Sequence, residues 1–438
     1  MKVNIIGAGI TGLSAAYFLV EKGHNVTVFD SAPDVGGLAG YFPVEGTYLE
    51  KYYHHIFSSH DELIRLMKDL ALDKELFFRQ VKMGFYYERH LYPFASAKDL
   101  LLFTPLKIRD RIRLGLSSLM MMRIKKWQTI EKRSALEWLR RYSGAESCQV
   151  IWEPLLKMKF GDDYQKISAA WLWNRVVDRK KTKGRGRSKE SLGYIRGGYK
   201  RLFDALIQKI RVKEGEIYTD MSVDSIRMTD GKVSGVIAKG KTFEGDVVLS
   251  TVSLPSFIGL APFLPEEYVN KLQSIKYQGS VCMVLKLKNA LSDYYWINVS
   301  DPDSPFVGII EHTNFVSSQE YGDRHMVYLT RYSSSENPFF SESEETIYND
   351  FILYLKSILP EFTNNEVEEY WVFKDRFSQP VFVKNYSKVI PKFITPIKNL
   401  YLLNTSQIYP QSRCLNSSIV KAREVVMKIM HNGEKQRH

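Results

Sequence analysis

Three glycines and one aspartate near the start of the chain have the types and the spacing of a phosphate-binding site. Gly7, Gly9 and Gly12 follow the short run "VNII" and form the pattern G-x-G-x-x-G. These glycines permit a tight turn, close approach of the backbone to a pyrophosphate, and close packing of a helix on a strand. Asp30 ends the run "NVTVFD", where a carboxylate can accept hydrogen bonds from both ribose hydroxyls of an adenosine. The pattern predicts a dinucleotide site, and an acid at residue 30 disfavours NADP.

The elements that position these residues follow from the same stretch. "VNII" is typical of a strand buried on both faces of a parallel sheet. "TGLSAAYFLVEKG" predicts a helix that ends at Gly23, and its N-terminus offers N–H groups and a positive dipole to a phosphate. Gly36 and Gly37 form a second glycine turn close to the same pyrophosphate, and NAD dehydrogenases generally lack this second turn.

The spacing "GxGxxG … D-x(5)-GG" resembles the signature of the superfamily of FAD-dependent amine oxidases, protoporphyrinogen oxidases and carotenoid desaturases. UDP-galactopyranose mutases share the cofactor fold. The resemblance implies FAD as the cofactor and an α/β fold: a Rossmann-like, glutathione reductase-type FAD-binding domain with an inserted α+β substrate domain. It also implies an oxidoreductase.

Further stretches of the chain resemble the same family and imply further cofactor contacts. In "GEIYTDMSVDSI", read as one strand, Val223 matches a valine whose backbone meets the adenine. In the last segment, Leu415 or Asn416 matches the helix N-terminus that points at the pyrimidine ring of the flavin. The family's acid at the start of this segment is absent, and Asn404 or Ser406 is the expected substitute.

Two adjacent histidines and two residues of a late loop are the candidates for proton transfer or substrate binding. His54 and His55 lie in "GTYLEKYYHHIFSSH", which resembles stretches beside the flavin in some mutases. If this stretch is a strand, only one of them can face the flavin; alternatively, one is a hydrogen-bonded core residue and the other is exposed. Tyr409 and Arg413 precede the flavin-facing helix. Tyr409 is alternatively a packed aromatic residue, and Arg413 a ligand of the cofactor pyrophosphate or of an anionic substrate. Cys414 stands where amine oxidases carry an aromatic residue, so the amine-binding cage is expected to be missing.

The resemblance divides the chain into two discontinuous domains. The FAD-binding domain is expected to comprise residues 1–75, 193–255 and 393–438, and the substrate-binding domain residues 76–192 and 256–392. The first insertion reads as largely helical and the second as rich in strands.

Composition limits the remaining classes of function. The chain has 438 residues, a net charge of +12 and three cysteines with neither metal-ligand spacing nor a disulfide pattern, so we expect no metal site and a reducing, cytoplasmic location. We also expect no secretory signal and no membrane-spanning helix. The basic run from Asp178 to Lys189 has few interleaved aromatic residues, so we expect a solvated loop and no nucleic-acid partner.

The stretch from Lys98 to Trp127 has two interpretations. Its basic residues flank Leu, Phe and Met at helical spacing, as in helices that lie in the headgroup plane at the inner face of a membrane. The alternative, which we favour from the sequence, is a helix of the substrate domain whose apolar face belongs to the core.

Three functions remain open at this point. The first is an FAD-dependent oxidase or dehydrogenase, desaturase-like or protoporphyrinogen oxidase-like, that acts on a bulky apolar, lipid-like or other small-molecule substrate. The second is a mutase-like isomerase acting on a nucleotide sugar or a polyprenyl-linked sugar. The third is a flavoprotein without catalysis that binds a partner.

Overall fold

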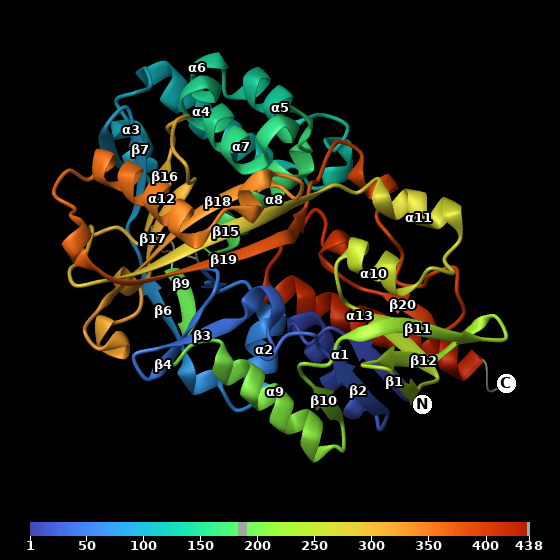
Figure 1. Cartoon of the computed structure of the whole chain (residues 1–438). Coiled ribbons are helices and arrows are strands. Elements are labelled where there is room, and N and C mark those ends of the chain that lie inside the picture. Colours follow the sequence, from blue (N-terminus) through green and yellow to red (C-terminus); the bar gives the residue numbers. More distant parts are fainter. Residues whose placement is uncertain (183–190, 436–438) are drawn as a thin grey trace.

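The computed structural model describes residues 1–182 and 191–435 of the chain. Figure 1 shows a parallel sheet with its helices at the lower right, a large mixed sheet running diagonally through the middle, and a layer of helices at the top. The basic run predicted as a solvated loop reaches residues 183–189, which lie outside the described residues.

Five parallel strands form the first sheet, in the order β10-β2-β1-β14-β20. Their bounds are Glu216–Tyr218, Asn25–Phe29, Lys2–Ile6, Val247–Ser250 and Leu400–Leu402. Along β1, Val3 and Ile5 belong to one core whereas Ile6 belongs to another. The sheet is therefore buried on both faces, which explains why its strands are almost uniformly apolar.

Three helices cover one face of this sheet and a small antiparallel sheet covers the other. The helices α1 (Ile10–Val20), α9 (Lys200–Val212) and α13 (Leu415–Lys435) pack against one another. The small sheet has the order β11-β12-β13, with bounds Val223–Thr229, Lys232–Ala238 and Lys241–Glu244. Blue, green and red elements lie together in this part of Figure 1, so the sheet gathers strands from three distant stretches of the chain. The predicted domain boundaries stay a prediction.

The second large sheet has seven strands in the order β19-β15-β18-β17-β16-β7-β8. Their bounds are Val367–Pro380, Tyr277–Leu287, His325–Ser334, Gly308–Glu311, Trp296–Val299, Met83–Tyr87 and His90–Pro93. Only β16 and β7 are parallel neighbours; the other pairs are antiparallel.

Two of these strands correct the expectation that residues 76–192 are largely helical, because β7 and β8 come from the start of that stretch. They are joined by Glu88 and Arg89, which both have positive φ, 47° and 64°. Such two-residue hairpin turns usually contain Asn-Gly or Asp-Gly. The sequence therefore gives no turn signal here, and the hairpin was missed.

Between Ala97 and Thr182 the stretch is mainly helical and forms the upper layer. The helices are α3 (Ala97–Leu102), α4 (Ile108–Arg123), α5 (Ala135–Tyr142), α6 (Ala145–Ser147), α7 (Glu153–Phe160) and α8 (Ala169–Thr182). In the described ranges, no helix combines the length and the apolar character that crossing a bilayer needs.

Small elements connect the layers. Two minor sheets have the orders β3-β4 and β5-β9-β6, with bounds Tyr41–Val44 and Thr47–Glu50, then Ile56–Phe57, Ser191–Ile195 and Leu76–Gln80. The other helices are α2 (Asp61–Asp69), α10 (Leu254–Leu260), α11 (Glu266–Gln273) and α12 (Glu344–Ile358). Residues 51–55, treated above as a strand, form a loop between β4 and β5, and "GEIYTDMSVDSI" forms two strands, β10 and β11, rather than one.

Candidate active site

The carboxyl ends of the five parallel strands meet along one edge of the first sheet, which is where such sheets bind ligands. Gly7 follows β1 and Asp30 follows β2. Backbone hydrogen bonds continue beyond the strands, from Gly7 N to Phe29 O and from Leu403 N to Ser250 O. The loops that carry the predicted cofactor residues are therefore neighbours in space.

The glycine turn closes tightly against the sheet and leaves one face open. A Cβ on Gly12 would lie 1.9 Å from Gly7 O, so no side chain fits there. Gly36 has a φ of +118°, a conformation that glycine adopts without strain, and its backbone forms a bridge with Gly9. A Cβ on Gly9 would meet nothing closer than 3.7 Å. The predicted glycines thus bring the two turns together as a cradle of bare backbone, which fits a pyrophosphate.

Asp30 ties the glycine turn to the end of β2. Its carboxylate accepts hydrogen bonds from Ala8 N at 2.6 Å and from Ala32 N at 2.9 Å. Each carboxylate oxygen keeps a further lone pair, so ribose hydroxyls can still donate to it. Met221 N donates to Asp30 O, which brings the start of β11, with Val223, to this side of the turn. The arrangement fits the adenosine half of FAD.

Asn404 and Ser406 organise the loop after β20. The Asn404 side chain donates to Val252 O at 2.8 Å and accepts from both the backbone N and the hydroxyl of Ser406. The amide therefore fixes the loop to the segment after β14. A direct contact of Asn404 or Ser406 with the cofactor stays a prediction.

The first turn of α13 is anchored next to α2. Asn416 accepts a hydrogen bond from Leu63 N at 3.0 Å, and the Cys414 thiol lies 3.3 Å from the Ser417 hydroxyl. The first N–H groups of a helix have no acceptor within the helix. The backbone at Leu415 and Asn416 therefore suits the predicted contact with a flavin carbonyl, which stays a prediction.

His54 is an uncharged imidazole of defined orientation. Its Nδ1 lies 2.6 Å from Tyr52 O, and because a carbonyl only accepts, Nδ1 carries the hydrogen and Nε2 keeps its lone pair. Burial lowers the pKa of His54 to about 4, and the charge of Arg413 acts in the same direction. Its ring lies 5.5 Å from the ring of Tyr199. His54 therefore offers a neutral acceptor nitrogen.

His55 points to a different set of side chains. Its ring contacts Phe57 at 4.9 Å and Trp296 at 6.3 Å, and its Nδ1 lies 3.5 Å from the Tyr295 hydroxyl. Burial lowers the pKa of His55 to about 3. The two histidines thus face different surroundings, although the segment that carries them is a loop.

Tyr409 and Arg413 lie in different surroundings from each other. The Tyr409 hydroxyl lies 2.8 Å from the Ser168 hydroxyl, and its ring packs against Trp127 at 5.2 Å. In the part of the chain that the structure describes, no hydrogen bond or ring contact joins Tyr409 to either histidine. Arg413 donates to Ser378 O and acts on His54 electrostatically. The structure thus brings Arg413 to His54 and leaves Tyr409 in an aromatic cluster of the helical layer.

Four side chains near His54 and His55 were not singled out from the sequence. The hydroxyls of Tyr53 and Tyr332 are 2.8 Å apart, and Lys159 Nζ lies 3.8 Å from the centre of the Tyr332 ring. Arg175, on α8, acts electrostatically on Lys159 and on His55. From the sequence, a basic residue on an amphipathic helix is predicted to face solvent. Only the tertiary structure shows that Lys159 and Arg175 lie near the histidines.

Glu50 was also missed. Its carboxylate accepts from Tyr199 N at 2.6 Å and from the Tyr194 hydroxyl, and burial raises its pKa to about 7. It therefore holds the end of β4 against the start of α9, directly before the loop that carries the histidines.

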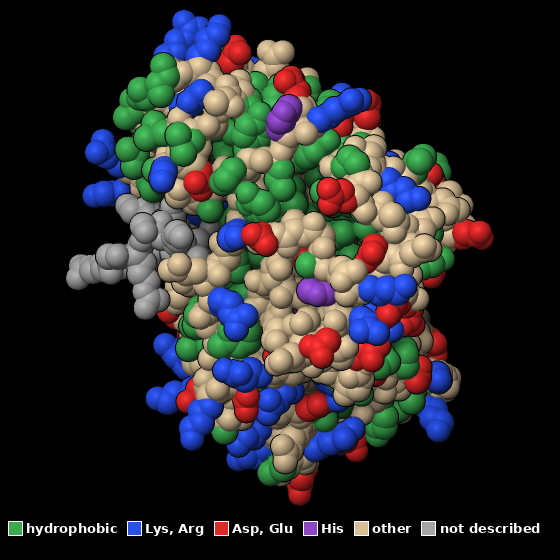
Figure 2. Space-filling view, turned by 90° about the vertical axis from the view of Figure 1, so that its left-hand side faces the viewer, with side chains coloured by type: hydrophobic (Ala, Val, Ile, Leu, Met, Phe, Trp, Pro, Cys, Tyr) green, Lys and Arg blue, Asp and Glu red, His purple; other side chains and the backbone are tan. Residues whose placement is uncertain are grey.

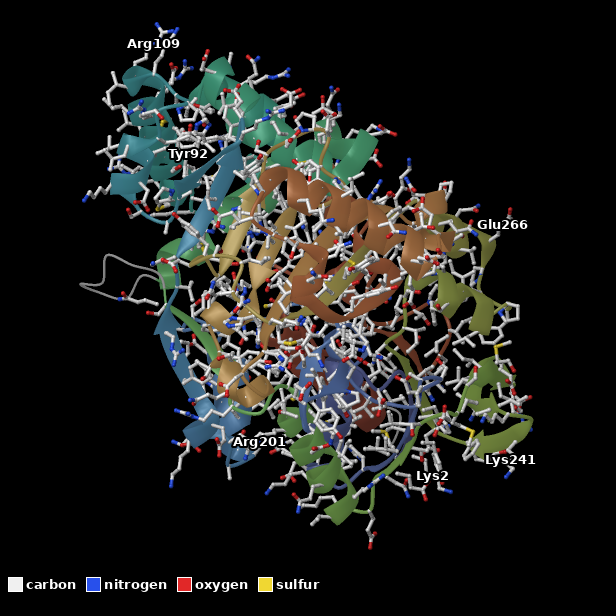
Figure 3. All side chains as sticks on the ribbon, turned by 60° about the vertical axis from the view of Figure 1, so that its left-hand side comes forward. Lys2, Tyr92, Arg109, Arg201, Lys241 and Glu266 are labelled. Carbon is white, nitrogen blue, oxygen red and sulfur yellow. The ribbon has the colours of Figure 1, made fainter. Side chains whose placement is uncertain are left out.

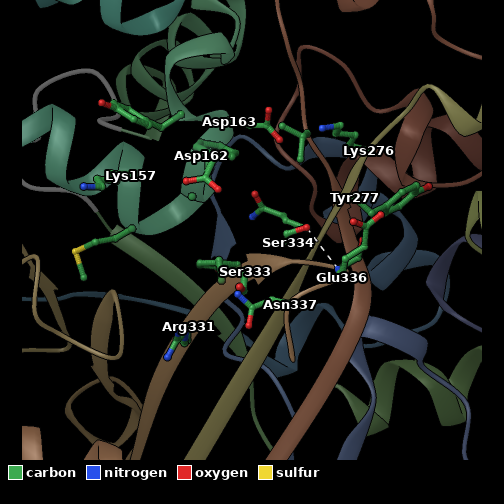
Figure 4. Close-up of a pocket in the computed structure, with 18 of the residues that line it drawn as sticks. Lys157, Asp162, Asp163, Lys276, Tyr277, Arg331, Ser333, Ser334, Glu336 and Asn337 are labelled. Atoms are coloured by element: carbon green, nitrogen blue, oxygen red, sulfur yellow. Dashed lines mark hydrogen bonds between the residues drawn. The ribbon is translucent and has the colours of Figure 1, made fainter. Parts of the chain in front are cut away.

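A cavity of about 1270 Å³ lies between the helical layer and the end of the seven-stranded sheet. Figure 4 shows Lys157 and Asp162 from the helical side, and Arg331 and Ser333 from β18. Phe160 and Tyr332 also line it. The Tyr332 ring thus stands between this cavity and Tyr53, so the cavity borders the histidine site rather than containing it.

The chain matches the model of one protein family, described as flavin containing amine oxidoreductase, over residues 10–407. The zeta-carotene desaturase of Synechocystis sp. (strain ATCC 27184 / PCC 6803 / Kazusa) is 22% identical over 489 residues, which cover 99% of this chain and 98% of that protein. The zeta-carotene desaturase of Zea mays is 38% identical over 81 residues, 18% of this chain and only 14% of that protein.

Solved structures share the fold. A protein provisionally named a protoporphyrinogen oxidase, from Exiguobacterium sp. 255-15, superposes with a TM-score of 0.78 at 16% identity, over 98% of both chains. Reduced UDP-galactopyranose mutase superposes with a TM-score of 0.77 at 16% identity, over 98% of this chain and 95% of that chain. At such identities the likeness concerns the fold alone, a mixed helix and strand architecture.

Proposed function

We propose, from the premise that this chain belongs to the flavin containing amine oxidoreductase family and is an FAD-dependent oxidoreductase, that it removes hydride from a bulky, largely apolar organic substrate. The predicted resemblance, redox class and FAD cofactor are confirmed by the family match. The observation that carries the proposal is the neutral His54 beside Tyr199 and Arg413, in a site walled by aromatic residues. Hydride removal needs a desolvated site of this kind rather than a set of charged acids and bases.

The chain's own residues have separate tasks in this proposal. The glycine cradle and Asp30 hold the FAD pyrophosphate and ribose, and the start of α13 meets the flavin end. FAD, when bound, would accept the hydride, which carries both electrons. Tyr53, Trp296 and Tyr295 exclude water from the substrate, and Nε2 of His54 accepts a hydrogen bond or a proton from it. Cys414, in the place of the amine oxidases' aromatic residue, argues against an amine substrate.

A membrane contact of α3 and α4 is part of the proposal, because it explains how an apolar substrate reaches the protein. Seven of the thirteen exposed large hydrophobic side chains among the described residues lie on these two helices: Leu101, Leu102, Ile108, Ile112, Leu116, Leu119 and Met120. Figure 2 shows hydrophobic side chains with Lys and Arg around them on the upper part of this face. Arg109 points outward there (Figure 3). An exposed apolar face with a basic rim suits a bilayer that carries anionic lipids, so these residues would make the protein peripheral.

A visible spectrum followed by an anaerobic titration tests the proposed function. We expect the purified protein to be yellow, and its flavin absorbance to bleach when lipid-like substrates are added without oxygen. Folded, colourless protein that does not take up FAD from solution would overturn the proposal. The proposal would also be overturned if dithionite reduced the bound flavin but none of the candidate organic substrates did.

A mutase-like isomerase is the second candidate, favoured by the cations Lys159 and Arg175 near His55. Such an enzyme works only after chemical reduction of the flavin and consumes no electrons. Turnover of a sugar nucleotide by the reduced protein alone, with the flavin still reduced afterwards, would favour this candidate.

A further inference from the structure

Three basic side chains lie close to one another, and we call them the cationic cluster: Lys159 on α7, Arg175 on α8 and Arg413 before α13. Arg175 and Arg413 both act electrostatically on Lys159. Lys159 lies over the ring of Tyr332, and the Tyr332 hydroxyl is hydrogen-bonded to the Tyr53 hydroxyl. The helix α8, which carries Arg175, contacts the loop of Arg413 through the 3.0 Å hydrogen bond from Asn174 to Ser412.

Burial affects the charges of the cluster although its side chains keep accessible surface. Lys159 and Arg413 keep part of their surface accessible, and Arg175 is exposed by the same measure. Yet burial is the largest cause that holds the pKa of Lys159 well below its ordinary value, and burial also lowers the pKa of Arg175. Accessible surface together with strong desolvation is expected of groups that line an internal space large enough for a ligand.

The carboxylates nearby are already engaged. Asp178, which faces Arg175, accepts from Asn174 at 2.6 Å and Ser412 at 3.2 Å. Asp375, which faces Arg413, accepts from Phe377 N at 2.8 Å. Within residues 1–182 and 191–435, no carboxylate lies within 4 Å of the charged atoms of the cluster. Arg179, which also acts on Arg175, adds a further cation of the same region.

Asp178 and Asp375 offset part of the positive charge, but like charges that lie together without a direct ion pair still oppose one another, so the cluster has a free-energy cost and does not serve stability. Lys159 has a cation–π contact with Tyr332 and Arg175 one with Trp171, at 5.3 Å, and these contacts offset only part of that cost. An anion between them would pair the charges, and the mutually bonded Tyr53 and Tyr332 hydroxyls leave one hydrogen free to donate to it.

We propose that the cationic cluster binds an anionic group of the substrate, a phosphoryl or carboxylate group, beside His54 and His55. The inference rests on the proposed function only in placing the substrate at this site. It narrows the substrate to an amphipathic anion: an apolar part that suits the aromatic walls and a charged group held by Lys159, Arg175 and Arg413. A cationic amine would be repelled.

The test uses the FAD-loaded protein, whose own pyrophosphate already fills the glycine cradle, so that added anions report on a different site. Inorganic phosphate and acetate are titrated at constant ionic strength, with benzylammonium as the cationic comparison, and the flavin absorbance and the melting temperature are followed. We expect a saturable change with one or both anions, which also tells phosphoryl from carboxylate recognition, and none with benzylammonium. Absence of saturable binding by both anions would overturn the inference.

Matched variants assign the binding to the cluster. Lys159→Met and Arg175→Gln should each weaken anion binding at least tenfold, whereas the exposed neighbours Lys132→Met and Arg133→Gln should leave it unchanged. Lys159→Met should also raise the melting temperature of the protein without added anion, because it removes one of the like charges of the cluster. Equal anion affinity in the cluster variants and the controls would refute the assignment.

These outcomes are separable from those of the proposed function. If the protein binds FAD and anions but no substrate reduces its flavin, the anion site is supported and the proposed hydride removal is overturned. If a substrate bleaches the flavin while anions neither bind nor compete with that substrate, the proposed function is supported and the anion site is overturned.

Discussion

Glu50 is a carboxyl group whose protonation depends on the fold. In the folded protein it is buried, and its pKa rises to about 7 from the ordinary 4.5. Between about pH 4.5 and 7 the folded state therefore binds a proton that the unfolded state has lost. Its contribution to stability is present at low pH, falls as the pH rises through this window, and stays lost above pH 7. His54 and His55, with lowered pKa values, act in the opposite sense and destabilise the fold as the pH falls below about 6.5.

Glu50→Gln should remove this dependence. A pKa displaced from 4.5 to about 7 corresponds to roughly 3 kcal/mol of stability across the window. The variant should therefore gain stability relative to the wild type as the pH rises from 5 to 8, measured by urea unfolding at each pH. The exposed Glu361→Gln is the control and should run parallel to the wild type. Parallel curves for Glu50→Gln as well would show that the carboxyl titrates normally.

A substitution at Gly12 tests whether the glycine turn binds the FAD pyrophosphate. In Gly12→Ala the new Cβ would lie 1.9 Å from Gly7 O, so the turn must open and the cradle for the pyrophosphate is lost. We expect at least a tenfold loss of FAD affinity, measured by the ratio of flavin to protein absorbance after dialysis. Gly259→Ala, on α10 with no atom within 4 Å of the new Cβ, should keep full flavin content. A yellow Gly12→Ala protein with normal affinity would exclude this role for the turn.

At the scale of elements, α4 carries apolar residues on two faces. Asp110, Leu114, Ser117 and Met121 are buried, whereas Ile108, Ile112, Leu116, Leu119 and Met120 are exposed. The alternative favoured from the sequence, in which the apolar face belongs to the core, accounts for only the first set. An exposed apolar side of this kind is typical of an interaction surface.

The double substitution Ile112→Asp and Leu116→Asp should abolish vesicle binding without affecting flavin content. We expect the wild type to sediment with vesicles that contain anionic phospholipid, more weakly at high salt because the basic rim is screened, and the variant to lose at least tenfold in partitioning. Leu353→Asp, on α12 and more exposed than either residue, is the control. Wild-type protein that stays in the supernatant at low salt would remove the membrane contact from the proposal.

The elements differ in how far the sequence predicts them. The strand, glycine turn, helix and second strand around Gly7 and Asp30 were predicted because all their signals lie within thirty residues. The β7–β8 hairpin was missed because Glu88 and Arg89 take positive φ without the usual turn residues. Lys159 and Arg175 were missed for a different reason: β18 and the loop before α13, against which α7 and α8 lie, come far later in the sequence.

At the scale of the whole molecule, the two ends of the described chain meet in one sheet and in the helices that cover it. β20 pairs with β14, β14 with β1, and α13 packs on α1. FAD bound at this edge as proposed would touch both ends at once, so ordering by the cofactor should be shared between them.

Removing FAD should therefore loosen both ends together. We expect the apoprotein to melt several degrees lower, since a ligand that binds only the folded state stabilises it. Amide hydrogen exchange should accelerate in the glycine turn and β2 and, to a similar extent, in residues 403–418, while β15 and β18 change little. Mass spectrometry of exchanged peptides measures this. Faster exchange at one end alone would contradict a shared site.

The place of β20 in the sheet also constrains biosynthesis. During synthesis, β1, α1 and β2 emerge well before β20 and α13, the strand and helix that complete their sheet and its helical layer. Until then the edge of β14 that pairs with β20 is unpaired while about 150 intervening residues are made, and the side of α1 that α13 covers is bare for longer. The proposed flavin site is therefore complete only after β20 and the start of α13 have emerged, so flavin capture would follow their synthesis.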